Sequence, residues 1–370
     1  MKQPRRILIV RPDRIGDVIM ATPLIRTLRQ TYPEAFIAAL VRPHTAPLLQ
    51  HNPRLDRILV DDFEGADRGR KGFRRKVREL RKLKFDTALM LLPTERHTWM
   101  TFLAGIRTRV SVGTRPYHVL TFTRTVSRNK YIPLRHEADY CMDLGRVVGA
   151  DSDNLDAELF LTNEEEQHMR EALQSMGWNL EQPLATVFPE TGGSAPGWAV
   201  GSWADFVARI LEERDDVFVL VDVVPGREQV RAAFQTIDSP RMLLSPGTSD
   251  LREVMAMIAA STVVVSASTG PMHMAAALKI PTVTQFCPLP ACSPRLWGPR
   301  GNLAKIVLPP DGYCREKCPG DPHVCSFEGG IGLDEMLSAV VEVLDELDVR
   351  ERNRINEAEN PGEEERMERS

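Results

Sequence analysis

Residues 7–30, ILIVRPDRIGDVIMATPLIRTLRQ, contain the pattern that decides the fold: a short aliphatic strand, a polar turn and an amphipathic helix. At the front of an α/β chain, such a turn is where nucleotide enzymes usually carry a glycine-rich phosphate loop. Here the turn has a single glycine, Gly16, among two aspartates and two arginines. Because carboxylates repel phosphate, this turn is not a typical phosphate cradle.

Length and composition describe a globular protein with more than one core. A chain of 370 residues exceeds the size at which single cores stop growing, so two domains are expected. Apolar residues make up 42% and charged residues 26%, and no apolar run is long enough to span a bilayer. The six cysteines are too few for a disulfide scaffold, and the basic start is followed by too short an apolar run for a signal peptide. We therefore expect a cytoplasmic location.

Apolar runs bounded by turn signals alternate with helical periodicity through both halves, which predicts parallel sheets with crossover helices. A polar stretch near Asp151 interrupts this pattern. We therefore predict an α/β fold with domains at 1–150 and 151–349, and a disordered charged tail at 350–370. The expected strands are 7–10, 36–41, 57–60, 85–92 and 109–112 in the first domain, and 184–188, 217–223, 242–244, 263–266 and 282–286 in the second. Helices are expected at 203–213, 250–260, 272–278 and 333–347, and Thr162 with Glu165 forms a capping box that opens another.

A second motif at residues 263–286, VVVSASTGPMHMAAALKIPTVTQF, predicts an anion site. A buried strand leads into Ser268, Thr269, Gly270 and Pro271, which suit the first turn of a helix and present free backbone N–H groups at its positive end. A diphosphate could bind there without a Walker lysine. His273 in the first turn could donate to a phosphate oxygen. The alternative is an ordinary, well-capped helix.

The segment 68–84, RGRKGFRRKVRELRKLK, holds ten Lys or Arg residues and one acid. It is either a solvated helix face or a site for a polyanion such as a phosphate-bearing lipid, a sugar phosphate or nucleic acid. Val77, Leu80 and Leu83 have helical spacing and should pack inward. Three common enzyme signatures are missing from the sequence: G-x-G-x-x-G after the first strand, the P-loop and the G-x-S-x-G elbow.

Together, ILIVRPDRIGDVIMATPLIRTLR and STGPMHMAAALKIPTVTQFCP resemble the ADP-heptose:lipopolysaccharide heptosyltransferases, glycosyltransferase family 9. The resemblance, over about residues 5–347, implies a GT-B fold in which two Rossmann-like domains face a cleft. It implies transfer of a sugar with inversion, without metal or cofactor, from ADP-heptose or another nucleotide sugar. The acceptor would be an anionic lipopolysaccharide core or other cell-envelope glycan, not nucleic acid, at the inner face of the cytoplasmic membrane.

The resemblance also assigns roles to residues. It implies that Asp17 is the general base that takes the proton of the acceptor hydroxyl, with Asp13 as the competing carboxylate. Glu228 resembles the family's ribose-contacting Glu. From charge, we expect the 268–273 turn to bind the donor diphosphate and Arg11 and Arg14 to position the acceptor. The predicted acceptor residues are Arg11, Arg14, Gly16, Arg74 and Arg75, and the predicted diphosphate residues are Ser268, Thr269, Gly270, Pro271 and His273.

Three donor-side positions depart from the family pattern. Pro196 stands where members commonly carry a Lys, Ser268 stands where Asp is frequent, and Glu190 adds a negative charge near the proposed phosphate site. A different nucleotide sugar, or weak donor binding, would fit these changes. A non-catalytic GT-B homologue with a binding or scaffold role is the second hypothesis, and a sugar epimerase or phosphorylase is the third.

Cysteines concentrate late in the chain. Cys314, Cys318, His323 and Cys325 could be zinc ligands, but their spacing lacks the usual C-x2-C knuckle. A redox pair or loop packing is the favoured interpretation, and we predict no metal site. Cys287 and Cys292 are expected to lie in the core or in loops.

Overall fold

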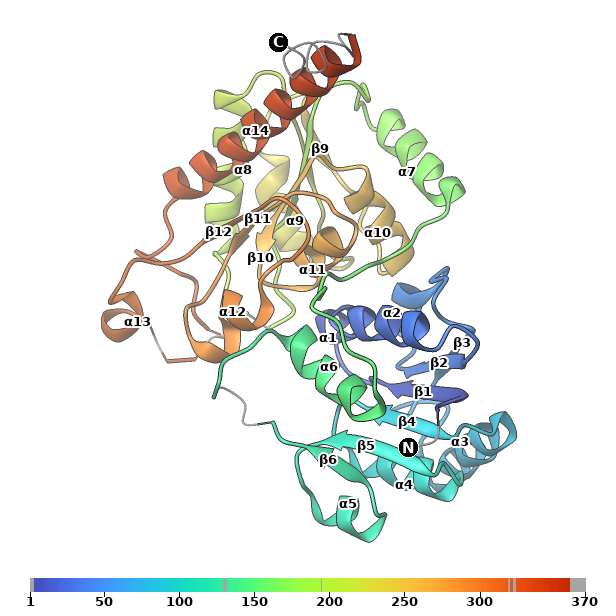
Figure 1. Ribbon diagram of the computed structural model, residues 1–370. Helices are drawn as coiled ribbons and strands as arrows, with labels where there is room; N and C mark the ends of the chain where they lie inside the picture. The colour runs from blue at the N-terminus through green and yellow to red at the C-terminus, as the bar shows by residue number, and fades with distance from the viewer. Residues whose placement is uncertain (1–2, 129–131, 194, 319, 322–323, 360–370) are drawn as a thin grey trace, which may run out of the picture.

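The computed structural model describes residues 3–128, 132–193, 195–318, 320–321 and 324–359. Two six-stranded parallel sheets form the molecule, one in each half of the chain (Figure 1). The first sheet has the order β3-β2-β1-β4-β5-β6 and the second β12-β11-β10-β7-β8-β9. The first sheet contains β1 (Arg6–Val10), β2 (Phe36–Val41), β3 (Arg57–Val60), β4 (Thr87–Met90), β5 (Thr108–Val112) and β6 (Arg124–Val126). The second contains β7 (Leu184–Phe188), β8 (Phe218–Val221), β9 (Met242–Leu244), β10 (Val263–Ala267), β11 (Thr282–Gln285) and β12 (Ala304–Val307).

Helices cover both faces of the first sheet, so its central strands are aliphatic throughout. Along β1, Ile7 and Ile9 pack with the core on one face, and Leu8 and Val10 pack with a separate core on the other. Figure 1 shows α2 and α6 on the face nearer the second domain and α3 and α4 on the opposite face. The helices of this half are α1 (Ile15–Ile19), α2 (Thr22–Thr31), η1 (Ala46–Leu49), α3 (Gly69–Leu83), α4 (Glu95–Leu103), α5 (Pro116–Leu120) and α6 (Glu137–Val148).

The second half repeats this construction around a core centred on Trp203 and Phe206, both fully buried. The long C-terminal helix α14 packs on α8 and on the sheet edge at β12 (Figure 1). The helices here are α7 (Asn163–Ser175), α8 (Val200–Glu213), α9 (Glu228–Gln235), α10 (Leu251–Ala259), α11 (Gly270–Ala277), η2 (Pro290–Cys292), α12 (Pro294–Trp297), α13 (Tyr313–Glu316) and α14 (Leu333–Glu359).

The fold class and every predicted strand are confirmed, and the differences have local causes. The single helix predicted after β1 is two helices, α1 and α2, broken at Met20–Ala21 just before Pro23, whose ring disfavours continuation of a helix. The predicted strand at 85–92 is reduced to β4, and β6 and β12 were not expected. Helix α14 continues to Glu359, so the prediction of disorder is wrong for residues 350–359, while residues 360–370 lie outside the described chain.

Several finer predictions can be compared directly with the structure. The Thr162–Glu165 capping box is formed, and Asp250 caps α10 by accepting from the Arg252 N–H. On α3, Val77 and Leu80 are buried and Leu83 is partly buried, as the helical spacing predicts. The predicted domain boundary near Asp151 falls in the extended segment between α6 and α7.

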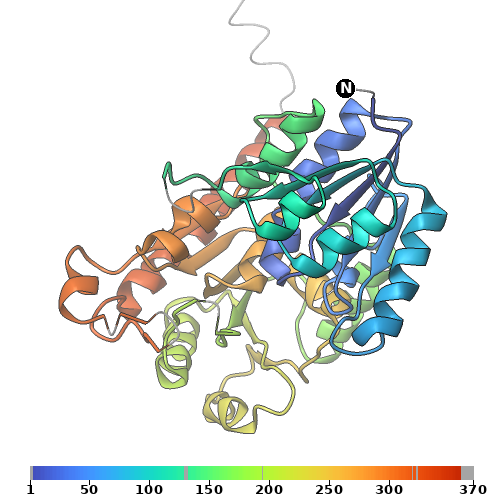
Figure 2. The same cartoon turned by 90° about the horizontal axis from the view of Figure 1, so that it is seen from below.

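The two halves are in direct contact through short helices that follow equivalent strands. Helix α1 packs against α11 (Figure 1), and Figure 2 shows the blue-to-green first half and the yellow-to-red second half side by side. Arg252 on α10 forms a second link, because its guanidinium donates to the Glu165 carboxylate and to the Pro47 carbonyl of the first half. The carboxyl ends of both sheets therefore face a shared space.

Candidate active site

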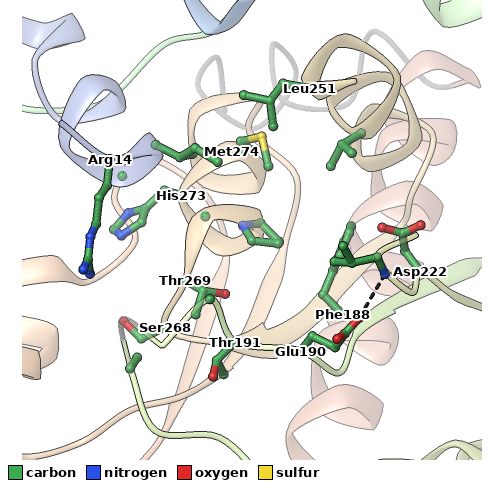
Figure 3. A pocket seen from close by; sticks show the side chains of 18 of the residues that line it. Arg14, Phe188, Glu190, Thr191, Asp222, Leu251, Ser268, Thr269, His273 and Met274 are labelled. Atoms are coloured by element: carbon green, nitrogen blue, oxygen red, sulfur yellow. Dashed lines mark hydrogen bonds between the residues drawn. The ribbon is translucent and has the colours of Figure 1, made fainter. Parts of the chain in front are cut away.

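A cavity of about 760 Å³ lies in that shared space. Its lining comes from both halves: Ile15, Gly16 and Asp17 on one side, and the loops after β7, β8 and β10 on the other. Figure 3 shows Arg14 on one wall and Glu190 and Asp222 on the opposite one. In parallel α/β sheets, ligands bind outside the carboxyl ends of the strands. Position and size make this cavity the candidate active site.

Arg11 forms ion pairs with the carboxylates beside the first wall of the cavity, the wall that contains Ile15, Gly16 and Asp17. Its side chain is 2% exposed, and its Nη2 donates to Asp17 Oδ1 at 2.7 Å and to Glu137 Oε1 at 2.9 Å. Nε donates to the Asp17 carbonyl and Nη1 to the Leu91 carbonyl. The sequence predicts Arg11 as an acceptor contact, but the structure buries it and uses all three guanidinium nitrogens internally. Arg11 is therefore placed to orient Asp17.

Three carboxylates, Asp13, Asp17 and Glu137, surround this one guanidinium. Burial raises the pKa of Asp17, and the charge of Arg11 opposes that rise. Burial likewise raises the pKa of Asp13 to about 7. A carboxylate with a raised pKa is a stronger proton acceptor than one in water. Asp17 lines the cavity whereas Asp13 is not among the lining residues, so only Asp17 faces a substrate-sized space.

The wall adjoining Asp17 is the N-terminus of α11, which packs against α1. Thr269 is its N-cap residue, but the Thr269 side chain makes no capping hydrogen bond. The first backbone N–H groups of a helix have no partner within it, and they carry the positive end of the helix dipole. Ser268, Thr269, Gly270 and Pro271 all line the cavity (Figure 3 labels the first two). The predicted anion site is thus brought into the same cavity as Asp17.

His273 lies where the two walls meet. It lines the cavity yet is 5% exposed, and its Nδ1 has no hydrogen-bond partner. Burial lowers the pKa of His273 to about 3, so the ring is neutral at pH 7. A Cβ on Gly16 would lie 2.7 Å from the His273 Cδ2 atom, so only glycine allows this approach of α1 to α11. His273 therefore has a packing role between the halves, and a neutral ring nitrogen remains to hydrogen-bond a ligand.

Two acidic side chains line the far part of the cavity. Glu190 Oε2 accepts from the Val224 N–H at 2.9 Å, and the Glu190 carboxylate pairs with Arg227 (Figure 3). Asp222, at the end of β8, is 6% exposed, and its Oδ1 has no partner. Burial raises the pKa of Asp222, and the Ser245 side chain opposes this by hydrogen-bonding to the carboxylate. The sequence prediction included Glu190 but missed Asp222.

Besides the buried Arg11, three predicted binding residues lie away from the cavity lining. Arg74 and Arg75 are exposed on α3, on the far face of the first sheet, and Arg75 pairs with Asp67. Glu228 is exposed at the start of α9 and is not a lining residue. Their sequence signals, a cationic run and a loosely aligned loop, do not specify which face a side chain occupies.

The late cysteines gather near this site. Cys287 hydrogen-bonds to Cys292 and to Cys314, and Cys292 lines the cavity. Cys318 and Cys325 pack with the same hydrophobic core, and the described cysteines are free thiols. Within the described ranges, no group of three or more His, Cys, Asp or Glu side chains is arranged to hold a metal ion, and the predicted alternative ligand His323 lies outside those ranges.

The two Rossmann-like units, with a cavity between them that is lined by Asp17 and by the N-terminus of α11, form a fold of the GT-B type. The sequence model of glycosyltransferase family 9 (heptosyltransferase) matches residues 73–319. The chain belongs to this family and is a glycosyltransferase.

Known relatives and solved structures agree with this family. The chain is 25% identical to lipopolysaccharide heptosyltransferase 2 of Escherichia coli (strain K12), over 83% of this chain and 89% of the relative. A family 9 glycosyl transferase from Veillonella parvula superposes with a TM-score of 0.78 at 18% identity, covering 92% of this chain and 97% of that one. The E. coli ADP-heptose lipopolysaccharide heptosyltransferase II superposes with a TM-score of 0.73 at 19% identity, covering 93% and 99%. These likenesses place the fold among GT-B heptosyltransferases.

Proposed function

We propose that the protein is an inverting, metal-independent glycosyltransferase that moves a heptose or related sugar from a nucleoside diphosphate to a cell-envelope glycan. The observation that carries this proposal is the placement of Asp17 and the α11 N-terminus in one cavity of about 760 Å³. The E. coli relative is named a lipopolysaccharide heptosyltransferase, and a solved structure of the E. coli heptosyltransferase WaaC contains ADP. ADP-heptose is therefore the first donor to test.

In the proposed reaction, the acceptor hydroxyl approaches the anomeric carbon from the Asp17 side. The Asp17 carboxylate takes the hydroxyl proton while the oxygen forms the new bond to the anomeric carbon. The bond from that carbon to the diphosphate breaks, and its electron pair leaves with the nucleoside diphosphate. Attack from the side opposite the leaving group inverts the anomeric configuration.

Fixed donors assist departure of the diphosphate. Negative charge grows on the leaving oxygens, and the N–H groups at the start of α11, Gly270 and Met272 among them, are placed to stabilise it. In this proposal, the dipole of α11 stabilises the charge of the leaving diphosphate, and the reaction needs no metal ion. Arg14 is exposed on the cavity wall and is available to an anionic acceptor.

The basic face of α3 suggests a separate role in membrane attachment. Arg74 is exposed there with other cations, so we propose that this face meets anionic headgroups while the cavity takes the acceptor glycan. In the described chain, no helix combines the length and apolarity that a membrane crossing requires. Reversal of charge at Arg74 and its exposed neighbours should reduce cosedimentation with anionic vesicles and leave turnover of a short, lipid-free acceptor unchanged.

The decisive experiment for function is a turnover assay with ADP-heptose and a truncated lipopolysaccharide acceptor, with and without EDTA. The proposal expects release of ADP, a product of inverted configuration and no effect of EDTA. The competing hypothesis, a GT-B homologue that binds without transfer, expects donor binding with no release of nucleoside diphosphate from any nucleotide sugar tried. Glu190 supports this second hypothesis, because it adds a negative charge to the donor side of the cavity.

A further inference from the structure

The turn that follows α5 carries a small apolar projection on the surface of the first domain. Val119, Leu120 and Phe122 have exposed fractions of 65%, 63% and 82%. Val119 and Leu120 end α5, and Phe122 follows the C-cap residue of that helix. Apolar side chains that are exposed singly are ordinary on protein surfaces, whereas a group of them indicates contact with another molecule or with a membrane. We call these three residues the α5 tip.

The backbone holds the α5 tip in one shape. The Thr123 N–H donates to the His118 carbonyl at 2.8 Å, and the Phe122 N–H donates to the Val119 carbonyl at 3.1 Å. These two bonds form a Schellman motif, in which the residue after the helix takes the left-handed conformation that glycine favours. That residue here is Phe122, with a φ of 52°. A bulky apolar side chain is therefore held in solvent at a position where glycine would be easier to accommodate.

Helices α3, α4 and α5 form one layer on the outer face of the first sheet, because α3 packs against α4 and α4 packs against α5 (Figure 1). Arg109 joins the α5 tip to α4, since its guanidinium donates to the Thr121 carbonyl and lies 5.2 Å from the centre of the Phe102 ring. Arg81 of α3 donates to the Leu103 carbonyl at 2.5 Å. Both contacts are made at the carboxyl end of α4, so the α5 tip and the basic face of α3 are joined there.

The charge of this layer is positive. Residues 103–124 contain four arginines and no acidic residue, and residues 68–84 contain ten Lys or Arg and one acid. Apolar side chains among cations match the chemistry of an anionic membrane, in which negative headgroups lie directly above acyl chains. A protein partner is a poorer match, because three side chains expose much less area than the roughly 800 Å² that each partner of a stable complex buries.

We propose that the α5 tip inserts into the interfacial region of an anionic phospholipid bilayer, with its three apolar side chains below the headgroups and the cations of α3 in contact with them. This inference rests on the proposed attachment of α3 to the membrane and adds an apolar anchor to it. Attraction of the cations brings the protein to the surface, and burial of apolar area then slows its departure. Anchoring at α5 also determines which end of the first domain faces the bilayer.

The test compares binding to vesicles of phosphatidylglycerol and phosphatidylcholine in equal parts, measured by cosedimentation of the full-length protein. The variant Leu120→Gln/Phe122→Asn removes apolar area from the α5 tip without changing its charge, and Asn tolerates the left-handed backbone at position 122. We expect this variant to bind about 10- to 100-fold more weakly than the wild type, because less apolar area leaves water on binding. Its melting temperature should not fall, since both side chains are exposed.

Leu308→Gln/Val349→Gln is the matched control, because it removes two exposed apolar side chains from the second domain. It should bind the vesicles like the wild type. Wild-type binding by the α5 variant, or an equal loss in the control, would overturn the inference while leaving the attachment of α3 and sugar transfer intact.

Two other outcomes have different consequences. A change from dimer to monomer in the α5 variant, seen by light scattering with vesicle binding unchanged, would assign the α5 tip to a second copy of the chain and overturn the inference. Absence of wild-type binding to the vesicles would overturn the inference together with the attachment of α3. Sugar transfer is tested separately, by turnover of ADP-heptose with a lipid-free acceptor.

Discussion

Replacing Arg11 with Met tests the organisation of the first wall of the cavity. The guanidinium is 2% exposed and contacts carboxylate oxygens of Asp17 at 2.7 Å, Glu137 at 2.9 Å and Asp13 at 3.3 Å. Removing one partner of a buried ion pair costs about 3–5 kcal/mol because the remaining charge stays buried without compensation. Met conserves most of the apolar volume, so the loss reports mainly the charge. We expect Arg11→Met to lose about 3–5 kcal/mol of unfolding free energy at pH 8.

The loss of unfolding free energy in Arg11→Met should be larger at high pH than at low pH. Burial already raises the pKa values of Asp13 and Asp17, and without the charge of Arg11 they should rise still further above their unfolded values near 4. The native state then binds more protons than the unfolded state above pH 4, so the stability of the variant falls as pH rises through that window. Urea unfolding of both proteins at pH 5 and pH 8 measures this. The loss should be clearly smaller at pH 5.

Arg209→Met is the matched control, because Arg209 is exposed and pairs with the surface carboxylates of Glu213 and Asp334. Exposed ion pairs contribute little to stability, so the control should unfold like the wild type at both pH values. Equal losses for Arg11→Met at pH 5 and pH 8, or a loss no larger than that of the control, would refute the assignment of Arg11 as the counterion of the buried carboxylates.

Three further predictions concern single contacts near the site. The pKa of Asp13 is raised to about 7 in the folded state, so Asp13→Asn should be more stable than the wild type above pH 7 by a few kcal/mol, with the difference vanishing toward pH 4; a constant difference in urea unfolding would contradict this. Gly16→Ala would place a Cβ 2.7 Å from the His273 Cδ2 atom, so it should lower the unfolding free energy by about 1–3 kcal/mol and reduce turnover. His273→Ala should restore stability in the double variant, whereas additive losses of stability on melting would argue against the contact. The hydrogen bond with Cys287 lowers the pKa of Cys292 to about 7, so alkylation of Cys292 by iodoacetamide, followed by mass spectrometry, should have its midpoint near pH 7 and move upward in Cys287→Ala; an unmoved midpoint would exclude this pairing.

The sheets were predictable from sequence because their signal is local. A run such as Ile7 to Val10 is buried on both faces, and burial on both faces requires continuous aliphatic residues. Strand β12 escaped prediction because it is a half-exposed edge strand that contains Lys305. The break between α1 and α2 falls just before Pro23, a residue that favours the first turn of a new helix over the interior of a continuing one.

The site was only partly predictable. The turn with Asp17 and the turn before α11 are local motifs, and the structure brings both to one cavity. The role of Arg11 depends on Glu137, a residue 126 positions along the chain, and no local pattern contains that pairing. Asp222 could have been found, since it is a single acid at the end of an aliphatic run, and ligands of such sheets bind outside the carboxyl ends of the strands.

The measurement that tests the central claim most directly is the turnover of Asp17→Asn beside that of Asp13→Asn, with donor affinity measured on the same samples. If Asp17 takes the acceptor proton, Asp17→Asn should lose about 10²- to 10⁴-fold in kcat while binding the donor normally, and Asp13→Asn should retain most of its turnover. Near wild-type kcat in Asp17→Asn, or a larger loss in Asp13→Asn, would contradict the account.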